Sequence, residues 1–238
     1  MSADRAQGLT RRQFVLGLSA GAAAILASGC VPKPPLAASS TPPGVPTSAQ
    51  LAKSELRVYG GQKLDSITTS IENSIVGVQY VDKAKWRLTV DGLVDTPAVY
   101  TFADLLAKFP ADKQVHRLDC VEGWGEDQLW EGVRIADVLL ASGVKKTATV
   151  VIFHGHDGYT TEYPVGYFDD THLLVYKLNG VELTAERGYP LRLGAWSKWG
   201  YKWARWIERI ELSSATNYQG YWESRGYSRD GERSQSSM

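Results

Sequence analysis

The feature that most constrains the fold is the shortness of the apolar segments between residues 85 and 212. Residues 85–92 alternate polar and apolar side chains before a turn, which is the pattern of a half-buried strand. Further strands are predicted at residues 115–120, 150–153, 173–178 and 204–212. Helical spacing extends over a few residues at a time, at 102–109 and 134–141. Because no segment supplies the long amphipathic helix of a bundle, the pattern predicts a single mixed α+β domain rather than a doubly wound parallel sheet.

Local signals bound both predicted helices. Thr101 can cap the first helix, because its hydroxyl can accept a hydrogen bond from an N–H group of the first turn, and Pro110 ends it. Gly143 follows the second helix, where a left-handed residue commonly ends a helix. Asp157 and Gly158 form a turn dipeptide after the third predicted strand.

The N-terminal part of the chain is not expected to join the core. Residues 31–54 contain six of the ten prolines, among Ser, Thr and Ala, a composition typical of a semi-extended tether. We therefore expect a signal segment at residues 1–29, a tether at 30–54 and one folded domain at 55–238, which is long enough to bury its own core. The net charge of zero gives no support to nucleic-acid binding.

Residues 10–30 resemble an export signal. Arg11 and Arg12 precede an uncharged run rich in Ala, Gly and Leu, as in the twin-arginine signals that export folded proteins. Residues 26–30 then resemble a bacterial lipobox, in which Cys30 would carry the lipid after cleavage. An uncleaved membrane anchor is the alternative, although a run of about 16 residues is short for a span. We expect an extracytoplasmic protein, periplasmic or at the cell surface, anchored to the membrane through Cys30.

The second cysteine, Cys120, would be left without a partner. Exported proteins usually pair their cysteines, and an unpaired thiol in an oxidising compartment is a liability unless it is buried or bound. Cys120 follows a predicted strand at a glycine-rich turn, where a thiolate could point into a cleft. A small buried hydrophobic side chain, a nucleophile and a metal ligand all remain open for it.

The histidines of the HGHD segment form a second candidate. If the strand continues past residue 153, His154 and His156 point to the same face. The pattern is similar to the HxHxD start of a binuclear metal site, but Asp157 lies one place too early, and His116 and His172 alone remain to complete it. A two-histidine metal site is therefore not favoured.

The third candidate is residues 187–206, which contain four tryptophans, five cations and no acid. The cations are Arg187, Arg192, Lys198, Lys202 and Arg205. Cations that lie among aromatic rings and glycines can bind an anion at close quarters. The alternative is a solvated basic face that acids from elsewhere in the chain neutralise.

Several motifs, in this order and spacing, resemble the sulfite oxidase-like family of molybdopterin-dependent oxidoreductases. They are LDCVEGWGEDQLWEGVRIADVL, DGYTTEYP, LLVYKLNG, RGYPLRL and KWGYKWARWI. The resemblance extends from about Trp86 to Leu212, and the tail GYWESRGYS (220–228) is similar to a branch of the exported bacterial group that is related to the periplasmic methionine sulfoxide reductase catalytic subunit. It implies the sulfite oxidase fold and a molybdenum–molybdopterin cofactor.

The resemblance also implies roles for particular residues. Cys120 would be the thiolate ligand of molybdenum, and Tyr159 would be the active-site tyrosine, placed to move a proton or hold a substrate oxygen. The cofactor would be contacted by residues of the basic stretch and its surroundings: Asn73, Arg187, Arg192, Lys198, Lys202, Trp203, Ala204 and Arg205. Some relatives carry a threonine near the cofactor where Gly155 stands here, so His154 or His156 is expected to serve instead.

The function that follows is two-electron oxygen-atom transfer to or from a small molecule. Reduction of a sulfoxide-like substrate is favoured, and sulfite oxidation on the same fold is the main alternative, with Arg187 as a cation for the substrate. No haem motif is present, so electrons are expected to pass through a separate partner, a membrane haem protein or a soluble cytochrome. A different class of function is a surface-anchored binding protein without chemistry.

Overall fold

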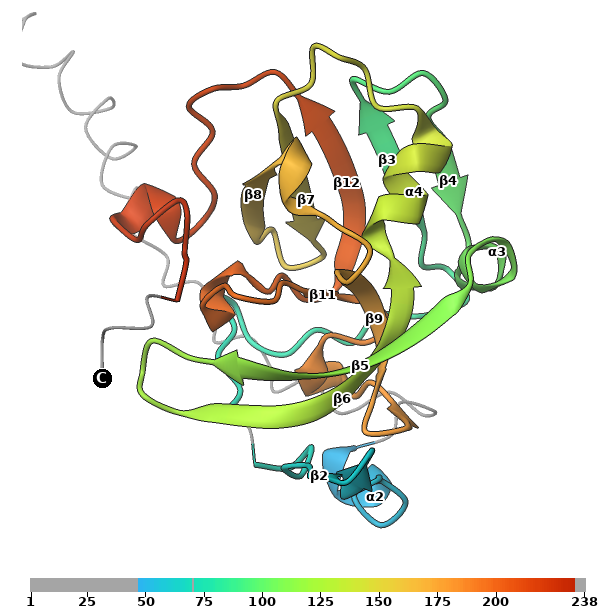
Figure 1. The fold of residues 1–238 in the computed structure, drawn as a ribbon, viewed down its shortest axis with the longest axis vertical. Helices are drawn as coiled ribbons and strands as arrows, with labels where there is room; N and C mark the ends of the chain where they lie inside the picture. The colour runs from blue at the N-terminus through green and yellow to red at the C-terminus, as the bar shows by residue number, and fades with distance from the viewer. Residues whose placement is uncertain (1–46, 70, 234–238) are drawn as a thin grey trace, which may run out of the picture. The chain divides into compact units, whose positions relative to one another are not determined.

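The computed structural model describes residues 47–69 and 71–233, and the strands within them form two five-stranded sheets and a short hairpin (Figure 1). The first sheet has the order β4 (Ala98–Tyr100), β3 (Leu88–Gly92), β12 (Ile207–Ser213), β7 (Val150–Gly155) and β8 (Thr160–Pro164). The second has the order β10 (Val181–Glu182), β9 (Leu173–Leu178), β6 (Gly125–Arg134) and β5 (Ala111–Asp119), with β11 (Arg192–Gly194) also paired to β9. The hairpin consists of β1 (Val58–Tyr59) and β2 (Gln62–Lys63).

Strand pairing is antiparallel throughout these sheets except between β12 and β3, which run parallel. The longest ladder joins β5 and β6, from Ala111 opposite Val133 to Asp119 opposite Gly125. That ladder ends at the turn that carries Cys120, and in Figure 1 the two strands form the long curved ribbon in green. The ladder therefore fixes the position of the Cys120 turn relative to the second sheet.

The helices are short. They are α2 (Ser48–Leu51), α3 (Phe102–Lys108) and α4 (Ile135–Ser142), with 3₁₀ turns η1 (Val165–Tyr167), η2 (Ala185–Arg187), η3 (Gly200–Lys202) and η4 (Glu223–Arg225). Thr101 and Asp104 form a capping box at the start of α3, which satisfies N–H groups that the helix itself leaves open. α4 ends at Gly143, whose φ of 65° is left-handed.

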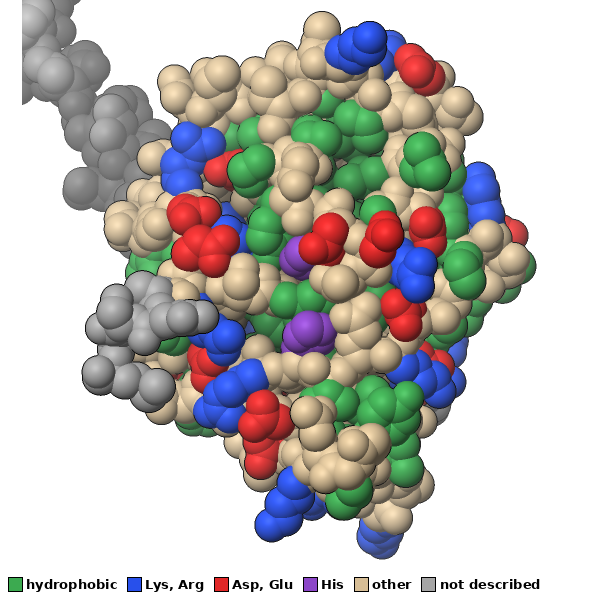
Figure 2. Space-filling model, in the orientation of Figure 1, with side chains coloured by type: hydrophobic (Ala, Val, Ile, Leu, Met, Phe, Trp, Pro, Cys, Tyr) green, Lys and Arg blue, Asp and Glu red, His purple; other side chains and the backbone are tan. Residues whose placement is uncertain are grey.

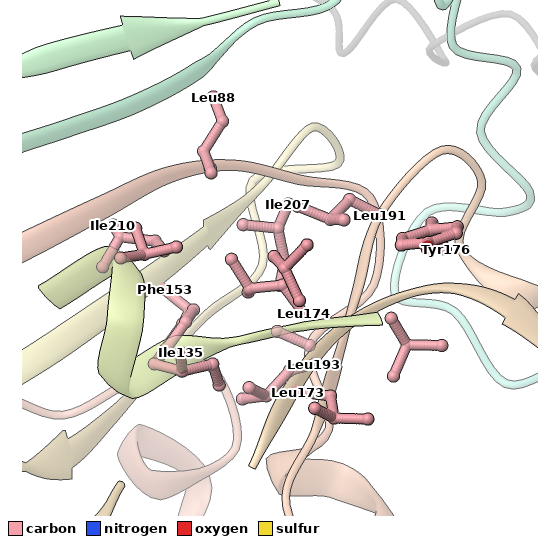
Figure 3. Packing of buried hydrophobic residues seen from close by; sticks show 14 of the residues in the cluster. Leu88, Ile135, Phe153, Leu173, Leu174, Tyr176, Leu191, Leu193, Ile207 and Ile210 are labelled. Carbon is pink, nitrogen blue, oxygen red and sulfur yellow. The ribbon is translucent and has the colours of Figure 1, made fainter. Parts of the chain in front are cut away.

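Side chains from both sheets enter one apolar core (Figure 3). Leu88 on β3, Phe153 on β7 and Ile210 on β12 come from the first sheet. Leu173 and Leu174 on β9 come from the second, and all five are fully buried or nearly so. Burial of such side chains is the main source of stability for a domain of this kind.

The expected fold class is confirmed, because strands and short helices together form a mixed α+β domain. The strand expected at 173–178 has the bounds of β9, whereas those expected at 115–120 and 204–212 are β5, which begins earlier, and β12, which begins later. Within the expected tether, Ser48–Leu51 form one helical turn with a Thr47 capping box, and the Ser48 hydroxyl bonds the Thr184 hydroxyl at 3.1 Å.

The expected signal segment and lipid site lie outside the described residues, so export and lipidation stay predictions. Among the described residues, no helix is long and apolar enough to cross a membrane. On the face seen in Figure 2, cationic and anionic side chains lie interspersed.

Candidate active site

Cys120 occupies the turn between β5 and β6. Its N–H donates to the Trp124 carbonyl at 2.8 Å, and the Gly123 N–H donates to the Cys120 carbonyl at 3.1 Å, so the backbone closes the turn. The side chain is 9% exposed and lines a cavity of about 180 Å³. A thiol at this position is held in place and faces the cavity.

Three arginines line the same cavity, together with three glutamates. The arginines are Arg187 on η2, Arg192 on β11 and Arg205 after η3; the glutamates are Glu122, Glu126 and Glu186. These residues come from segments far apart in the sequence: the turn between β5 and β6, β6 itself, the loop after β10, β11, and the loop after β11.

Of the three cavity arginines, Arg192 has the fewest protein partners for its positive charge. Its side chain is 5% exposed, and its Nη1 donates to the Arg187 carbonyl at 3.3 Å, but its Nε has no hydrogen-bond partner within the described part of the chain. Burial lowers the pKa of Arg192 to about 9, and the nearby Arg205 and Arg187 add to this effect. A buried cation beside two others is costly unless an anion joins them.

The other two arginines have protein partners. The Arg187 Nε donates to the Ile67 carbonyl at 3.0 Å, and its Nη1 lies 3.7 Å from the Glu126 Oε1. The Arg205 Nη1 donates to the Glu72 Oε1 at 2.8 Å and to the Glu186 carbonyl at 2.9 Å. Part of the positive charge of these two side chains is therefore already balanced.

Gly188 leaves room for these arginines. Its φ is +97°, and a Cβ there would lie 2.9 Å from the Arg205 Cβ and 3.1 Å from the Arg192 Cβ. A larger residue would be strained and would push both side chains away from their positions.

Lys198 and Lys202 do not line the cavity of Cys120. The Lys202 ammonium is fully buried and bonds the Glu223 Oε1 at 2.6 Å. The Lys198 Nζ bonds Asp230 at 2.9 Å and also Glu232. Acids of the C-terminal segment pair with both lysines, and a contact between either lysine and the cofactor stays a prediction.

Four other expected residues gather around a second, adjoining cavity: Asn73, Tyr159, Trp203 and Ala204. Asn73 and Trp203 line the Cys120 cavity as well. The Asn73 Nδ2 donates to the Glu122 Oε1 at 3.0 Å. The Tyr159 hydroxyl donates to the Tyr201 carbonyl, and burial raises its pKa far above the usual value, so Tyr159 stays protonated.

His154 and His156 lie elsewhere. The His154 Nε2 is 2.9 Å from the Glu211 Oε2, and the His156 Nδ1 is 2.7 Å from the Glu208 Oε1, both on β12. Neither histidine lines the two cavities described above. Among the residues described, no group of three or more His, Cys, Asp or Glu side chains is placed to hold a metal ion.

The sequence interpretation missed several cavity residues. Glu126 faces the cavity from β6, and the rings of Trp124, Tyr201, Trp222 and Tyr227 line it. The sequence carried no signal for Glu126, because polar residues at alternate strand positions, such as Glu126 and Gln128, are typical of an exposed strand face, and only the structure shows that both are buried on β6.

The chemistry of the lining fits a soft metal bound to an anionic group. Thiolate sulfur is a preferred ligand for soft metals. Burial raises the pKa of the Cys120 thiol, and the nearby Glu122 carboxylate adds to this effect. Binding of a metal by Cys120 would therefore have to displace the proton of the thiol. The unpartnered Nε of Arg192 offers a hydrogen bond to an anion. The lining therefore suits a cofactor that combines a soft metal with an anionic group.

The comparison with protein families identifies the cofactor. The model described as the oxidoreductase molybdopterin binding domain matches residues 75–222, and the chain belongs to this family. It is therefore a molybdenum-cofactor-dependent oxidoreductase, its cofactor is molybdenum–molybdopterin, and the expected resemblance to the sulfite oxidase-like family is confirmed. A surface binding protein without chemistry is ruled out.

Relatives with known names support the assignment. The chain is 40% identical over 155 residues to the uncharacterized oxidoreductase YuiH of Bacillus subtilis (strain 168), covering 64% of this chain and 77% of that one. It is 34% identical over 152 residues, covering 63% of this chain and 57% of the relative, to the putative protein-methionine-sulfoxide reductase subunit YedZ1 of Azospira oryzae. It is 26% identical over 227 residues to the protein-methionine-sulfoxide reductase catalytic subunit MsrP of Ralstonia nicotianae, covering 85% and 68%.

A solved structure shares the fold. The sulfane dehydrogenase SoxCD from Paracoccus pantotrophus matches with a TM-score of 0.56 and 23% sequence identity, covering 75% of this chain and 55% of that one. At this identity the likeness concerns the fold and not the substrate.

Proposed function

We propose that this chain reduces a sulfoxide-like substrate by two-electron oxygen-atom transfer at molybdenum. The reaction consumes two electrons and two protons, breaks the S–O bond and releases a sulfide and water. Two of the relatives carry the names of protein-methionine-sulfoxide reductase subunits, which supports this direction. The observation that carries the proposal is the shared cavity of Cys120 and the buried, unsatisfied Arg192.

In this proposal, Cys120 ligates the metal and Arg192 and Arg205 hold the pterin's phosphate, with Arg187 and Asn73 beside them. Bound there, the molybdenum–pterin group supplies the oxygen-atom transfer chemistry. The cavity residues orient the substrate and exclude water, which strengthens every electrostatic contact inside. Trp203 and Ala204 contribute packing and backbone next to that group.

Proton delivery falls to groups of the two cavities. Burial raises the pKa of the Glu126 carboxyl, which makes Glu126 the cavity group best suited to deliver one proton. Tyr159, with its pKa far above the usual value, acts as a hydrogen-bond donor rather than a base.

Sulfite oxidation is the alternative and is less well supported. A sulfite anion needs several cations with free charge, and Arg187 already contacts the Ile67 carbonyl and Glu126. Arg205 pairs with Glu72 and is assigned in this proposal to the pterin's phosphate, so it offers no further charge to a sulfite anion.

We also propose an extracytoplasmic location, lipid attachment at Cys30 and a separate electron-transfer partner, a membrane haem protein or a soluble cytochrome. The paired arginines and the lipobox-like sequence support the first two. The whole-protein activities of the relatives are attributed to this chain only as part of this proposal.

The test uses protein made in a host that synthesises the cofactor. Molybdenum per chain is measured, and reduction of methyl sulfoxides with a reduced viologen dye is compared with oxidation of sulfite by ferricyanide. We expect sulfoxide turnover by the loaded enzyme and none by Cys120→Ser. Turnover of sulfite alone would assign the alternative, and equal activity in the serine variant would remove Cys120 from the site.

A further inference from the structure

The C-terminal segment 220–233 forms one wall of the Cys120 cavity. Its residues Trp222 and Tyr227 line that cavity, and their rings lie 5.0 Å apart. The Tyr227 ring also contacts the ring of Tyr201, at 5.1 Å, so three aromatic rings are joined at the cavity. The segment contains the motif GYWESRGYS, for which the cofactor provides no explanation.

Lys202 attaches this wall to the domain. Its ammonium bonds the Glu223 Oε1 at 2.6 Å, the Glu162 carbonyl at 2.8 Å and the Arg229 carbonyl at 2.9 Å. An ammonium has three protons to donate, and these three acceptors use all of them. Lys202 therefore has no donor left for a cofactor phosphate, and two of its acceptors belong to the segment 220–233.

Glu223 is held from a second side. Its Oε1 also accepts a hydrogen bond from the Thr161 hydroxyl on β8 at 2.8 Å, and the Lys202 and Glu223 side chains are both 0% exposed. Removing one partner from such a pair leaves an uncompensated buried charge, whereas replacing both by apolar side chains of similar volume is often neutral.

Lys198 and the backbone attach the far end of the wall. The Trp199 N–H donates to the Gly231 carbonyl at 2.8 Å, and Lys198 bonds Asp230 and Glu232. Gly231 has φ +61°, and a Cβ there would lie 2.5 Å from the Lys202 Cγ, so only glycine lets the segment approach this closely. Arg233 then pairs with Asp119, the residue before Cys120.

We propose that segment 220–233 is a clamped aromatic wall that selects the substrate, with Trp222 and Tyr227 as the substrate-contacting residues and Lys198 and Lys202 as positioning residues. The inference rests on the proposed function and names its substrate class: neutral sulfoxides that carry an aromatic or large apolar group next to the sulfur. Such a group gains from contact with the rings, which an inorganic oxyanion cannot.

Binding is tested without turnover, on the oxidised holoenzyme with no reductant, by calorimetric titration with phenyl methyl sulfoxide and with dimethyl sulfoxide. We expect Trp222→Ala to weaken binding of the phenyl compound about tenfold or more and that of dimethyl sulfoxide far less. The control is Tyr218→Ala, an aromatic residue a few positions before the wall that does not line the cavity. Equal affinities in wild type and Trp222→Ala would overturn the wall.

The clamp is tested by Lys202→Met and by the double variant Lys202→Met/Glu223→Leu. We expect the single variant to be cut faster by trypsin at Arg225 or Arg229 and to bind the phenyl compound more weakly. The double variant leaves no unpaired buried charge, so it should recover most of the lost protease resistance and affinity, with full molybdenum per chain, while the Glu162 and Arg229 carbonyls remain without the Lys202 donor. If the folded double variant loses molybdenum, Lys202 contacts the cofactor and the proposed positioning role is wrong. If the double variant does not restore binding of the phenyl compound, the positioning role of Lys202 is wrong as well.

These outcomes are separate from the reaction itself. If the loaded wild type binds phenyl methyl sulfoxide through Trp222 but does not reduce it, the proposed function is wrong and the substrate-selecting role of segment 220–233 is retained. If it reduces both sulfoxides and Trp222→Ala changes neither affinity nor KM, the wall fails and the proposed function stands.

Discussion

Replacing Arg192 by methionine should stabilise the cofactor-free protein. Arg192 is buried, and its pKa falls from the ordinary value of an arginine to about 9 because of burial and of the positive charges of Arg205 and Arg187. At 1.36 kcal/mol for each tenfold change in the protonation equilibrium, this lowering of the pKa corresponds to about 5 kcal/mol of unfavourable free energy in the charged, folded state. This cost is present without an anion in the cavity.

Two favourable contacts of Arg192 reduce the expected gain. Its hydrogen bond to the Arg187 carbonyl contributes about 1 kcal/mol, and the position of its guanidinium over the Trp130 ring contributes about 1 kcal/mol more. The net gain for Arg192→Met is then about 3 kcal/mol, or a rise in Tm of about 6 to 12 °C for a domain of this size.

The assay is thermal unfolding of protein made without cofactor synthesis, followed at several pH values. Because the folded pKa of Arg192 lies below the unfolded one, the destabilisation by its charge is fully present below pH 9 and is relieved as the pH rises through about 9 towards the unfolded pKa. The stability difference between variant and wild type should therefore narrow above pH 9.

A matched control is Arg209→Met. Arg209 is partly exposed and pairs with Asp91 and Glu211, so its loss should lower stability by about 0 to 1 kcal/mol. In a cofactor-producing host, Arg192→Met should contain less molybdenum per chain than wild type. A lower or unchanged Tm for cofactor-free Arg192→Met would refute the view that the cavity is electrostatically incomplete without an anion.

Three further predictions concern the cysteines and export. In the cofactor-free protein, the rate of Cys120 alkylation should rise with pH through a midpoint that lies above the usual pKa of a thiol. Glu122→Gln should lower that midpoint, because the negative charge of Glu122 disfavours the thiolate. An unchanged midpoint would show that Glu122 does not raise the pKa of Cys120. Arg11→Lys together with Arg12→Lys should leave the precursor inside the cell, as fractionation and immunoblotting would detect, and normal export would point to another route. Cys30→Ala should move the protein from the membrane fraction to the soluble one, unless an uncleaved apolar segment holds it there.

Local structure was predictable because it depends on neighbouring residues. Thr101 and the helix after it were anticipated, since a capping residue acts on N–H groups within one turn. Gly143 ends α4 for a similarly local reason. The length of β5 was not anticipated: it begins at Ala111 because β6 extends to Val133 opposite it, and a strand's extent depends on its partner.

The sequence by itself determined the family and with it the cofactor, because the motifs around Cys120 and along residues 187–206 resemble the molybdopterin-dependent family and the family comparison confirms it. Tertiary structure alone decided which cations serve the cavity. In the sequence, Lys202 and Arg205 are both cations of the same basic stretch, but in the fold Glu223 of the C-terminal segment pairs with Lys202. Charge neutralisation acts through space and not along the chain, so it depends on which distant segments the fold brings together.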